Sequence, residues 1–154
     1  KLILILIFCI FISFLFNLGI FFKTKVFLGD SGSTTLGFLV AWFLIYFSFE
    51  DYIHESLIIW CVTLPVFDML RVIFQRISNK NNPFKPDRTH IHHILLIAGY
   101  SNKLILFLTI LYSILSSFLG SLIFNYLGPD FNIILYVFWF IVYFILVNKY
   151  ILKK

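Results

Sequence analysis

Five long apolar runs dominate the chain, and short polar segments separate them. The runs extend approximately over Leu2 to Phe22, Thr34 to Phe49, Ser56 to Gln75, Leu104 to Tyr126 and Phe131 to Val147. Each reaches or approaches the length of about 20 residues that a helix needs to cross the hydrocarbon of a bilayer. The pattern predicts an all-α, polytopic membrane protein with about five transmembrane helices, and we interpret residues 1–154 as a single integral membrane unit.

The longest polar segment, residues 76–103, predicts one long loop between the third and fourth runs. If successive segments lie on alternate sides of the membrane, every basic residue except Lys1 is on the same side as this loop. The positive-inside rule then places the loop and the C-terminus in the cytoplasm, at the cell inner (plasma) membrane. We interpret His54, which falls on the opposite side, as an ordinary solvated residue.

Composition agrees with this pattern and narrows the class of protein. Of the 154 residues, 61% are hydrophobic and 12% are charged, whereas a soluble domain has about 25% charged residues. The formal charge of +5 comes without a basic stripe interleaved with aromatic residues, so we expect membrane lipid around the protein and no nucleic acid as a partner. Cys9 and Cys61 lie inside apolar runs, where a lone cysteine behaves as a small hydrophobe.

The first motif, residues 27–34, lies where the second apolar run begins. It reads Phe-Leu-Gly-Asp-Ser-Gly-Ser-Thr, and its hydroxyl side chains can cap a helix. Its glycines allow close backbone approach, so that the free N–H groups and the positive dipole end of the helix can face a phosphate. Asp30 suits a hard cation such as Mg²⁺, which takes oxygen ligands. The alternative is a simple helix start, at which the dipole favours Asp30.

The second motif, Pro65-Val66-Phe67-Asp68-Met69-Leu70-Arg71, lies near the inner end of the third run. Pro65 lacks a backbone donor and can kink the helix. Asp68 and Arg71 are three residues apart and can pair on one helix face. An ionisable residue at membrane depth indicates a functional site by default. The alternative is a buried Asp68–Arg71 pair that only fixes helix packing, with Arg71 extending toward the membrane surface.

The third motif occupies residues 83–93, in the predicted cytoplasmic loop, and contains three histidines. Mg²⁺ does not favour imidazole, so His90, His92 and His93 are better suited to donating hydrogen bonds to phosphate oxygens. Arg88 can add a bidentate clamp on the same group. A zinc site is one alternative, although no fourth ligand pattern accompanies the histidines. A solvated loop without a function is the other.

The three motifs, in this order, resemble one family of membrane enzymes. The residues that carry the resemblance are Val26-Phe27-Leu28-Gly29-Asp30-Ser31-Gly32-Ser33, Pro65-Val66-Phe67-Asp68 and Pro83-Phe84-Lys85-Pro86-Asp87-Arg88-Thr89-His90-Ile91-His92-His93. The family is that of the polyprenyl-phosphate N-acetylhexosamine-1-phosphate transferases, glycosyltransferase family 4. The chain is most similar to its bacterial undecaprenyl-phosphate N-acetylglucosamine-1-phosphate transferases, which initiate lipopolysaccharide O-antigen, enterobacterial common antigen or wall teichoic acid. The order Pro-Asp-Arg before His-Ile-His-His argues against the phospho-muramoyl-pentapeptide branch.

This resemblance implies a reaction and its participants. The enzyme would transfer N-acetylglucosamine 1-phosphate from a UDP-N-acetylhexosamine to undecaprenyl phosphate and release UMP, with Mg²⁺, or alternatively Mn²⁺, as the ion. Asp30 matches the metal-associated aspartate of the family and, with His90, His92 and His93, is a predicted catalytic residue. The predicted substrate-binding residues are Arg88, Asp87, Asp68, Ser31 and Gly32. A homodimer is a further expectation.

The chain also departs from the family pattern. The paired acidic motif Asp-Asp-x-x-Asp does not occur in it, and the acidic pair Glu50-Asp51 falls on the wrong side of the predicted membrane. We therefore expect this chain to be the C-terminal half of a larger transferase and to be inactive alone. Two other classes stay open: a membrane transporter or channel subunit that uses Asp68 and the cytoplasmic histidines, and a structural or assembly protein.

Overall fold

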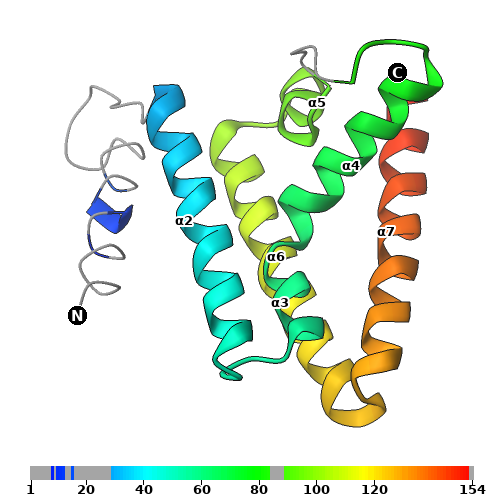
Figure 1. Cartoon of the computed structure of the whole chain (residues 1–154). Helices are drawn as coiled ribbons and strands as arrows, with labels where there is room; N and C mark the ends of the chain where they lie inside the picture. Colours follow the sequence, from blue (N-terminus) through cyan, green and yellow to red (C-terminus); the bar gives the residue numbers. More distant parts are fainter. Residues whose placement is uncertain (1–7, 9, 13–14, 16–28, 84–88, 153–154) are drawn as a thin grey trace. The chain divides into compact units, whose positions relative to one another are not determined.

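The computed structural model describes residues 29–83 and 89–152, together with residues 8, 10–12 and 15. All regular secondary structure in these ranges is helical, which confirms the predicted fold class. The helices, shown in Figure 1, are α2 (Gly29–Phe49), α3 (Glu55–Cys61), α4 (Thr63–Ser78), α5 (Ile91–Ile97), α6 (Asn102–Leu127) and α7 (Pro129–Leu152). The chain divides into two compact units, Lys1–Phe47 and Ser48–Lys154.

The first unit contains almost all of α2, an apolar helix whose segment Ser31–Phe49 is long and apolar enough to cross a membrane. The helix begins at Gly29, which has φ 67°, and therefore upstream of the predicted start at Thr34. The hydroxyl residues of the first motif consequently lie within the first turns of α2 and not at its cap. The first predicted span, Leu2 to Phe22, falls largely outside the described residues.

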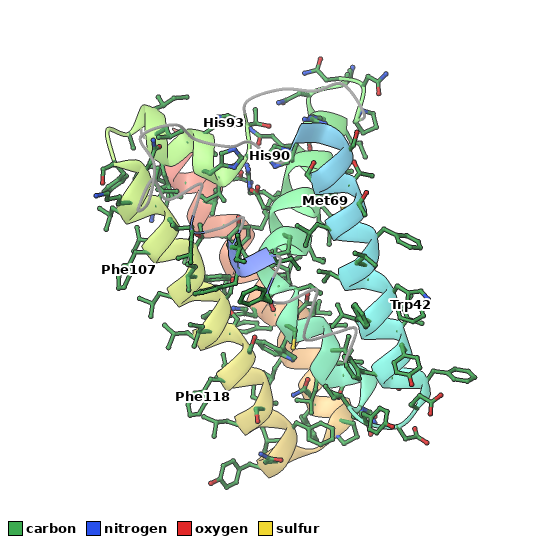
Figure 2. The ribbon with its side chains drawn as sticks, turned by 90° about the vertical axis from the view of Figure 1, so that its left-hand side faces the viewer. Trp42, Met69, His90, His93, Phe107 and Phe118 are labelled. Carbon is green, nitrogen blue, oxygen red and sulfur yellow. The ribbon has the colours of Figure 1, made fainter. Side chains whose placement is uncertain are left out.

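In the second unit, α6 and α7 form an antiparallel hairpin that reverses at Gly128, which has φ 85°. Both helices meet the length and hydropathy expected of a membrane span. Large apolar side chains of α6, such as Phe107 and Phe118, point away from the bundle (Figure 2) and are more than half exposed. Such outward apolar surface suits lipid as the surrounding solvent, so the structure is that of a helical membrane protein.

The third predicted span is broken into α3 and α4, which meet at an angle of 76°. Only the two helices together are long and apolar enough to cross a membrane. The break lies at Val62, just upstream of Pro65, because a proline ring clashes with the carbonyl group four residues before it. The predicted kink is thus confirmed. The carbonyl oxygen of Trp60 at the break accepts hydrogen bonds from Thr63 Oγ1 at 2.7 Å and Ser117 Oγ at 3.3 Å.

A neutral cluster of three residues, which we call the Trp60 cluster, joins α3 to the α6–α7 hairpin. The indole of Trp60 lies on Gly120, where any Cβ would overlap the ring. Trp60 Nε1 donates to Asn132 Oδ1 at 2.6 Å, and Asn132 Nδ2 donates to the carbonyl oxygen of Gly120 at 2.6 Å. Trp60 and Asn132 are 1% and 0% exposed, so the polar atoms of their side chains are satisfied by each other and by α6.

The two ends of the second unit differ in charge. Arg76 lies in the last turn of α4 and Lys149 in the last turn of α7, at the end that also carries α5 (Figure 1). Glu55 and Asp130 lie in the first turns of α3 and α7, at the other end. The unpredicted helix α5 lies inside the predicted loop 76–103 and packs on α6.

Candidate functional site

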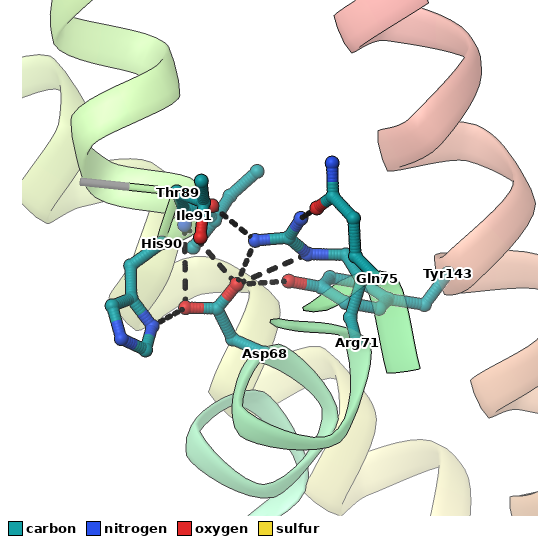
Figure 3. A network of polar contacts seen from close by, with 7 residues as sticks. All are labelled: Asp68, Arg71, Gln75, Thr89, His90, Ile91 and Tyr143. Atoms are coloured by element: carbon teal, nitrogen blue, oxygen red, sulfur yellow. Dashed lines mark hydrogen bonds and ion pairs between the residues drawn. The ribbon is translucent and has the colours of Figure 1, made fainter. Parts of the chain in front are cut away.

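The carboxylate of Asp68, on α4, is the centre of a polar network at the basic end of the second unit (Figure 3). Its Oδ1 accepts from Arg71 Nη2 at 2.8 Å, from the backbone N–H of Ile91 at 3.1 Å and from Tyr143 Oη at 3.3 Å. Its Oδ2 accepts from His90 Nδ1 at 2.9 Å. Asp68 is 7% exposed, so donors on three separate segments of the chain have replaced most of its water.

Arg71 is 0% exposed and lies beside Asp68, as the spacing of three residues predicted. Taking a guanidinium out of water is costly unless its donors are paired. Besides Asp68, it donates to Gln75 Oε1 at 3.1 Å and, through a short hydrogen bond, to the carbonyl oxygen of Thr89. The Asp68–Arg71 pair therefore does more than join two turns of α4, because it also holds the residue that precedes His90.

Helix α7 contributes Tyr143, which sequence patterns did not indicate. The ring of Tyr143 packs on Phe67 with a centroid separation of 5.7 Å, and both belong to a buried apolar cluster with Val147. This packing carries the hydroxyl group to Asp68. A tyrosine inside a long apolar run resembles any other aromatic residue of a span. Nothing in the sequence therefore indicated that Tyr143 contacts Asp68, which lies 75 residues earlier in the chain.

The three histidines lie together at the start of α5. His90 is the N-cap residue, and its side chain is 38% exposed. The ring centroids of His92 and His93 are 4.1 Å apart, and those of His90 and His92 are 6.1 Å apart. Partial burial lowers the pKa of His92 below 6.5, and the neighbouring His93 and His90 lower it further, although Asp68 opposes them. Because the three imidazoles lie close together at the start of one helix, they can contact the same polar ligand.

The described side chains hold no group of three or more His, Cys, Asp or Glu residues arranged to bind a metal ion. Both oxygens of Asp68 already accept from nitrogen and hydroxyl donors, which a cation would have to displace. Asp30 lies in the first turn of α2, in the first unit, and its side chain falls outside the described residues. A carboxylate at that position is an oxygen donor of the kind that Mg²⁺ takes.

The other predicted site residues are distributed as follows. Ser31 and Gly32 lie in the first turns of α2, and the carbonyl oxygen of Ser31 accepts from Thr35 Oγ1 at 2.8 Å. Asp87 and Arg88 lie outside the described residues. The second unit therefore brings together Asp68 and the histidine motif, whereas its contacts through Gln75, Thr89 and Tyr143 were not predicted.

An apolar cavity of about 750 Å³ adjoins this network on the side of α6 and α7. Ile91 and Tyr143, which both bond Asp68, also line the cavity. The rest of its wall is made mostly of leucine and aromatic side chains from α6 and α7. A polar network thus borders a space suited to hydrocarbon.

Comparison with known proteins agrees with the sequence motifs. The chain is 38% identical over 95 residues, 58% of its length, to the undecaprenyl-phosphate alpha-N-acetylglucosaminyl 1-phosphate transferase of Pasteurella multocida. It is 39% identical over 92 residues to the protein of that name from Haemophilus influenzae and 38% identical over 90 residues to that from Escherichia coli K12, in each case over 56% of the chain. The resemblance to these transferases is therefore confirmed.

These matches cover only a part of each relative. The matched region is 26% of the length of the Pasteurella and Haemophilus proteins and 24% of the Escherichia coli protein. No family model matches the chain, and no solved structure matches it. The chain therefore spans about a quarter of the length of the curated relatives to which it is similar.

Proposed function

We propose that the full-length protein transfers N-acetylglucosamine 1-phosphate from UDP-N-acetylglucosamine to undecaprenyl phosphate and releases UMP. The observation that carries this proposal is the similarity, over more than half of the chain, to transferases that are named for undecaprenyl phosphate and N-acetylglucosaminyl 1-phosphate. The grouped histidines beside Asp68 and the neighbouring apolar cavity suit a phosphorylated lipid chemically. This product would begin the synthesis of a cell-envelope polysaccharide.

In the proposed reaction, an oxygen of the lipid phosphate attacks the β-phosphorus, which carries the sugar. One P–O bond forms, and the bond between the β-phosphorus and the bridging oxygen breaks, so that UMP leaves with that oxygen. Negative charge accumulates on the phosphoryl oxygens, and positioned donors stabilise it. His90, His92 and His93 supply imidazole groups for this task, and Arg88 and Asp87 belong to the same loop.

We propose Mg²⁺, or alternatively Mn²⁺, as the ion that the full-length protein uses, with Asp30 as the ligand from this chain. When bound, the ion neutralises the charge of the diphosphate. Mg²⁺ usually keeps several waters and shares substrate oxygens, so one or two carboxylates are sufficient protein ligands. Asp68 suits this task less, because Arg71 and His90 already occupy its oxygens. Ser31 and Gly32, at the same helix start, are suited to contact the substrate through backbone N–H groups.

The basic end of the second unit is proposed to face the cytoplasm. Arg76 and Lys149 lie at this end, whereas Glu55 and Asp130 lie at the other. The positive-inside rule favours that orientation in the plasma membrane. Reporter fusions after residue 81 and after the C-terminus should both report the cytoplasm, and a periplasmic signal from either would contradict the orientation.

The reaction can be tested on the purified full-length protein in lipid nanodiscs, with UDP-N-acetylglucosamine labelled in the sugar. We expect label in a lipid-linked sugar diphosphate and an equal amount of UMP. Release of UDP would indicate transfer of the sugar without its phosphate and would overturn the proposal. His54→Asn is a matched control, because it changes a histidine at the opposite end and keeps a residue that can cap α3.

The ion can be tested in the same assay. Chelation should abolish transfer, and Mg²⁺ alone should restore it. Asp30→Asn should lower Mg²⁺-dependent transfer by at least about 100-fold, on the order of 3 kcal/mol in the barrier. Rescue that requires zinc would instead indicate that the histidines hold that metal.

A further inference from the structure

The surroundings of Asp68 differ from those of a residue that binds a substrate. An ionised carboxylate has about four lone-pair sites. Arg71, His90, Ile91 and Tyr143 direct donors at these sites within 3.3 Å, and the side chain is 7% exposed. Little capacity is left for a further ligand. The carboxylate is instead suited to holding the groups around it.

The groups that Asp68 holds all belong to the start of α5. His90, the N-cap residue, makes no side-chain cap bond of its own. The carboxylate of Asp68 takes that place and accepts the N–H of Ile91 at 3.1 and 3.2 Å. An anion at a helix N-terminus is also favoured by the helix dipole. Since Asp68 lies 23 residues before Ile91, its carboxylate fixes a loop helix to a membrane helix.

The same contact determines the tautomer of His90. A carboxylate only accepts hydrogen bonds, so the Nδ1 atom of His90, 2.9 Å from Asp68 Oδ2, must carry the proton. The bond at Nδ1 leaves Nε2 as the ring atom that can meet a ligand, and the side chain is 38% exposed. In Figure 3 the imidazole lies on the opposite side of Asp68 from Arg71 and Tyr143.

Two buried groups hold the carboxylate itself in place. Arg71 fixes it from the same helix through Nε and Nη2, at 3.3 and 2.8 Å from Oδ1. Tyr143 fixes it from α7 through its hydroxyl group, at 3.3 Å. The chain of contacts from Tyr143 through Asp68 to His90 thus runs from the buried apolar cluster to the exposed imidazole.

We propose that Asp68 is a positioning residue that, held by Arg71 and Tyr143, fixes the tautomer of His90 and the first turn of α5, so that His90 Nε2 faces the phosphate. The inference rests on the proposed function, since it gives His90 a contact with the substrate. It replaces direct substrate binding by Asp68 with an action through His90. Loss of the carboxylate should therefore reduce turnover more than substrate binding.

The first test uses the full-length protein and measures kcat and KM for the two substrates. Asp68→Asn should lower kcat by about 100-fold, as wrong orientation of a functional histidine does elsewhere, with both KM values changed by less than about threefold. His90→Gln should remove the contribution of the positioned imidazole to kcat altogether. The double variant should therefore be about as slow as the slower single variant. Additive losses, or a normal kcat in Asp68→Asn, would overturn the proposal.

A milder pair of variants covers the case in which Asp68→Asn does not fold. Tyr143→Phe removes one hydrogen bond to Asp68 and should lower kcat by about three- to tenfold. Tyr112→Phe is the matched control, because its ring lies 6.0 Å from that of Tyr143 and lines the same cavity, but its hydroxyl group makes no hydrogen bond to Asp68. Equal effects of the two changes would overturn the proposal.

A second readout is independent of turnover. ¹⁵N NMR of histidine-labelled protein, on the alkaline side of the titration and with His90→Gln to assign the signal, should show His90 protonated at Nδ1. Asp68→Asn should convert it to a mixture of tautomers. A wild-type His90 protonated at Nε2 alone would overturn the proposal. If the tautomer is as expected but wild-type protein makes no lipid-linked product, the proposed function fails and the positioning contact stands.

Discussion

The Trp60 cluster and the Asp68 network lie on the two halves of one broken span. They differ in charge and in their exposure to solvent. The Trp60 cluster is neutral, and its donors and acceptors are satisfied within the bundle. The Asp68 network is charged and extends to His90, whose side chain is 38% exposed. Buried hydrogen bonds between neutral groups stabilise a helix contact, whereas a charged network that reaches the surface can act on a ligand. We therefore expect changes in the first to affect stability and changes in the second to affect transfer.

The largest expected effect is that of His90→Ala in the full-length protein. This change removes the imidazole that we propose to face the phosphate, so transfer should fall by about 1,000-fold. The melting temperature in nanodiscs should change little, because the side chain is partly exposed. His54→Asn should keep wild-type transfer. A fall of less than about threefold for His90→Ala would contradict the functional assignment of the network.

Gly120→Ala tests the Trp60 cluster by overpacking. The added methyl group would overlap the indole of Trp60 and should destabilise the fold by about 2 kcal/mol. Gly37→Ala is the matched control, since nothing lies within 4 Å of a Cβ there, and alanine is favoured over glycine in a helix by about 0.5–1 kcal/mol. Thermal unfolding in nanodiscs should give shifts of opposite sign. Equal shifts would show that the indole does not need the glycine.

A smaller loss of stability is expected for Asn132→Ala. It leaves the indole N–H of Trp60 without its acceptor, which should cost about 1–2 kcal/mol in a membrane protein. Asn125→Ala, at an exposed position of α6, is the control. The kcat of the folded fraction should be that of the wild type for both variants. A selective loss of kcat in Asn132→Ala would remove the distinction between the two regions.

The smallest effect concerns pH. Because the pKa of His92 in the folded state is below 6.5, the unfolded state takes up a proton first as the pH falls. The contribution of His92 to stability should be complete above about pH 6.5 and should decrease as the pH falls toward its lowered pKa. Melting temperatures of the wild type and His92→Gln, compared between about pH 7.5 and about pH 5.5, should differ in slope. Asn132→Ala should keep the wild-type slope.

Sequence patterns predicted the parts of this structure that depend on local signals. The long runs became α2, α6 and α7 because continuous apolar length is itself the requirement for crossing a bilayer. The Asp68–Arg71 pair followed from helical spacing. The bend before Pro65 followed from the missing N–H and the bulk of proline.

What the patterns missed depends on contacts between distant segments. Helix α5 has only seven residues, which is too short for a helix to be stable alone. The backbone N–H of its first residue, Ile91, donates to Asp68 on α4. Tyr143 and Asn132 are single polar residues in a long apolar run, and only the packing of α7 shows which atoms they meet. The first motif illustrates a smaller error, because α2 begins before the hydroxyl residues that were predicted to cap it.

Because the span breaks at Val62, the number of residues between Trp60 and Asp68 determines where both side chains lie. Each residue in a helix turns the next side chain by about 100° and advances it by about 1.5 Å. Inserting or deleting one residue between Trp60 and Asp68 would therefore carry either the indole away from Gly120 or the carboxylate away from Ile91. A change of one residue in the length of this segment should destabilise the fold more than a substitution at its exposed Cys61.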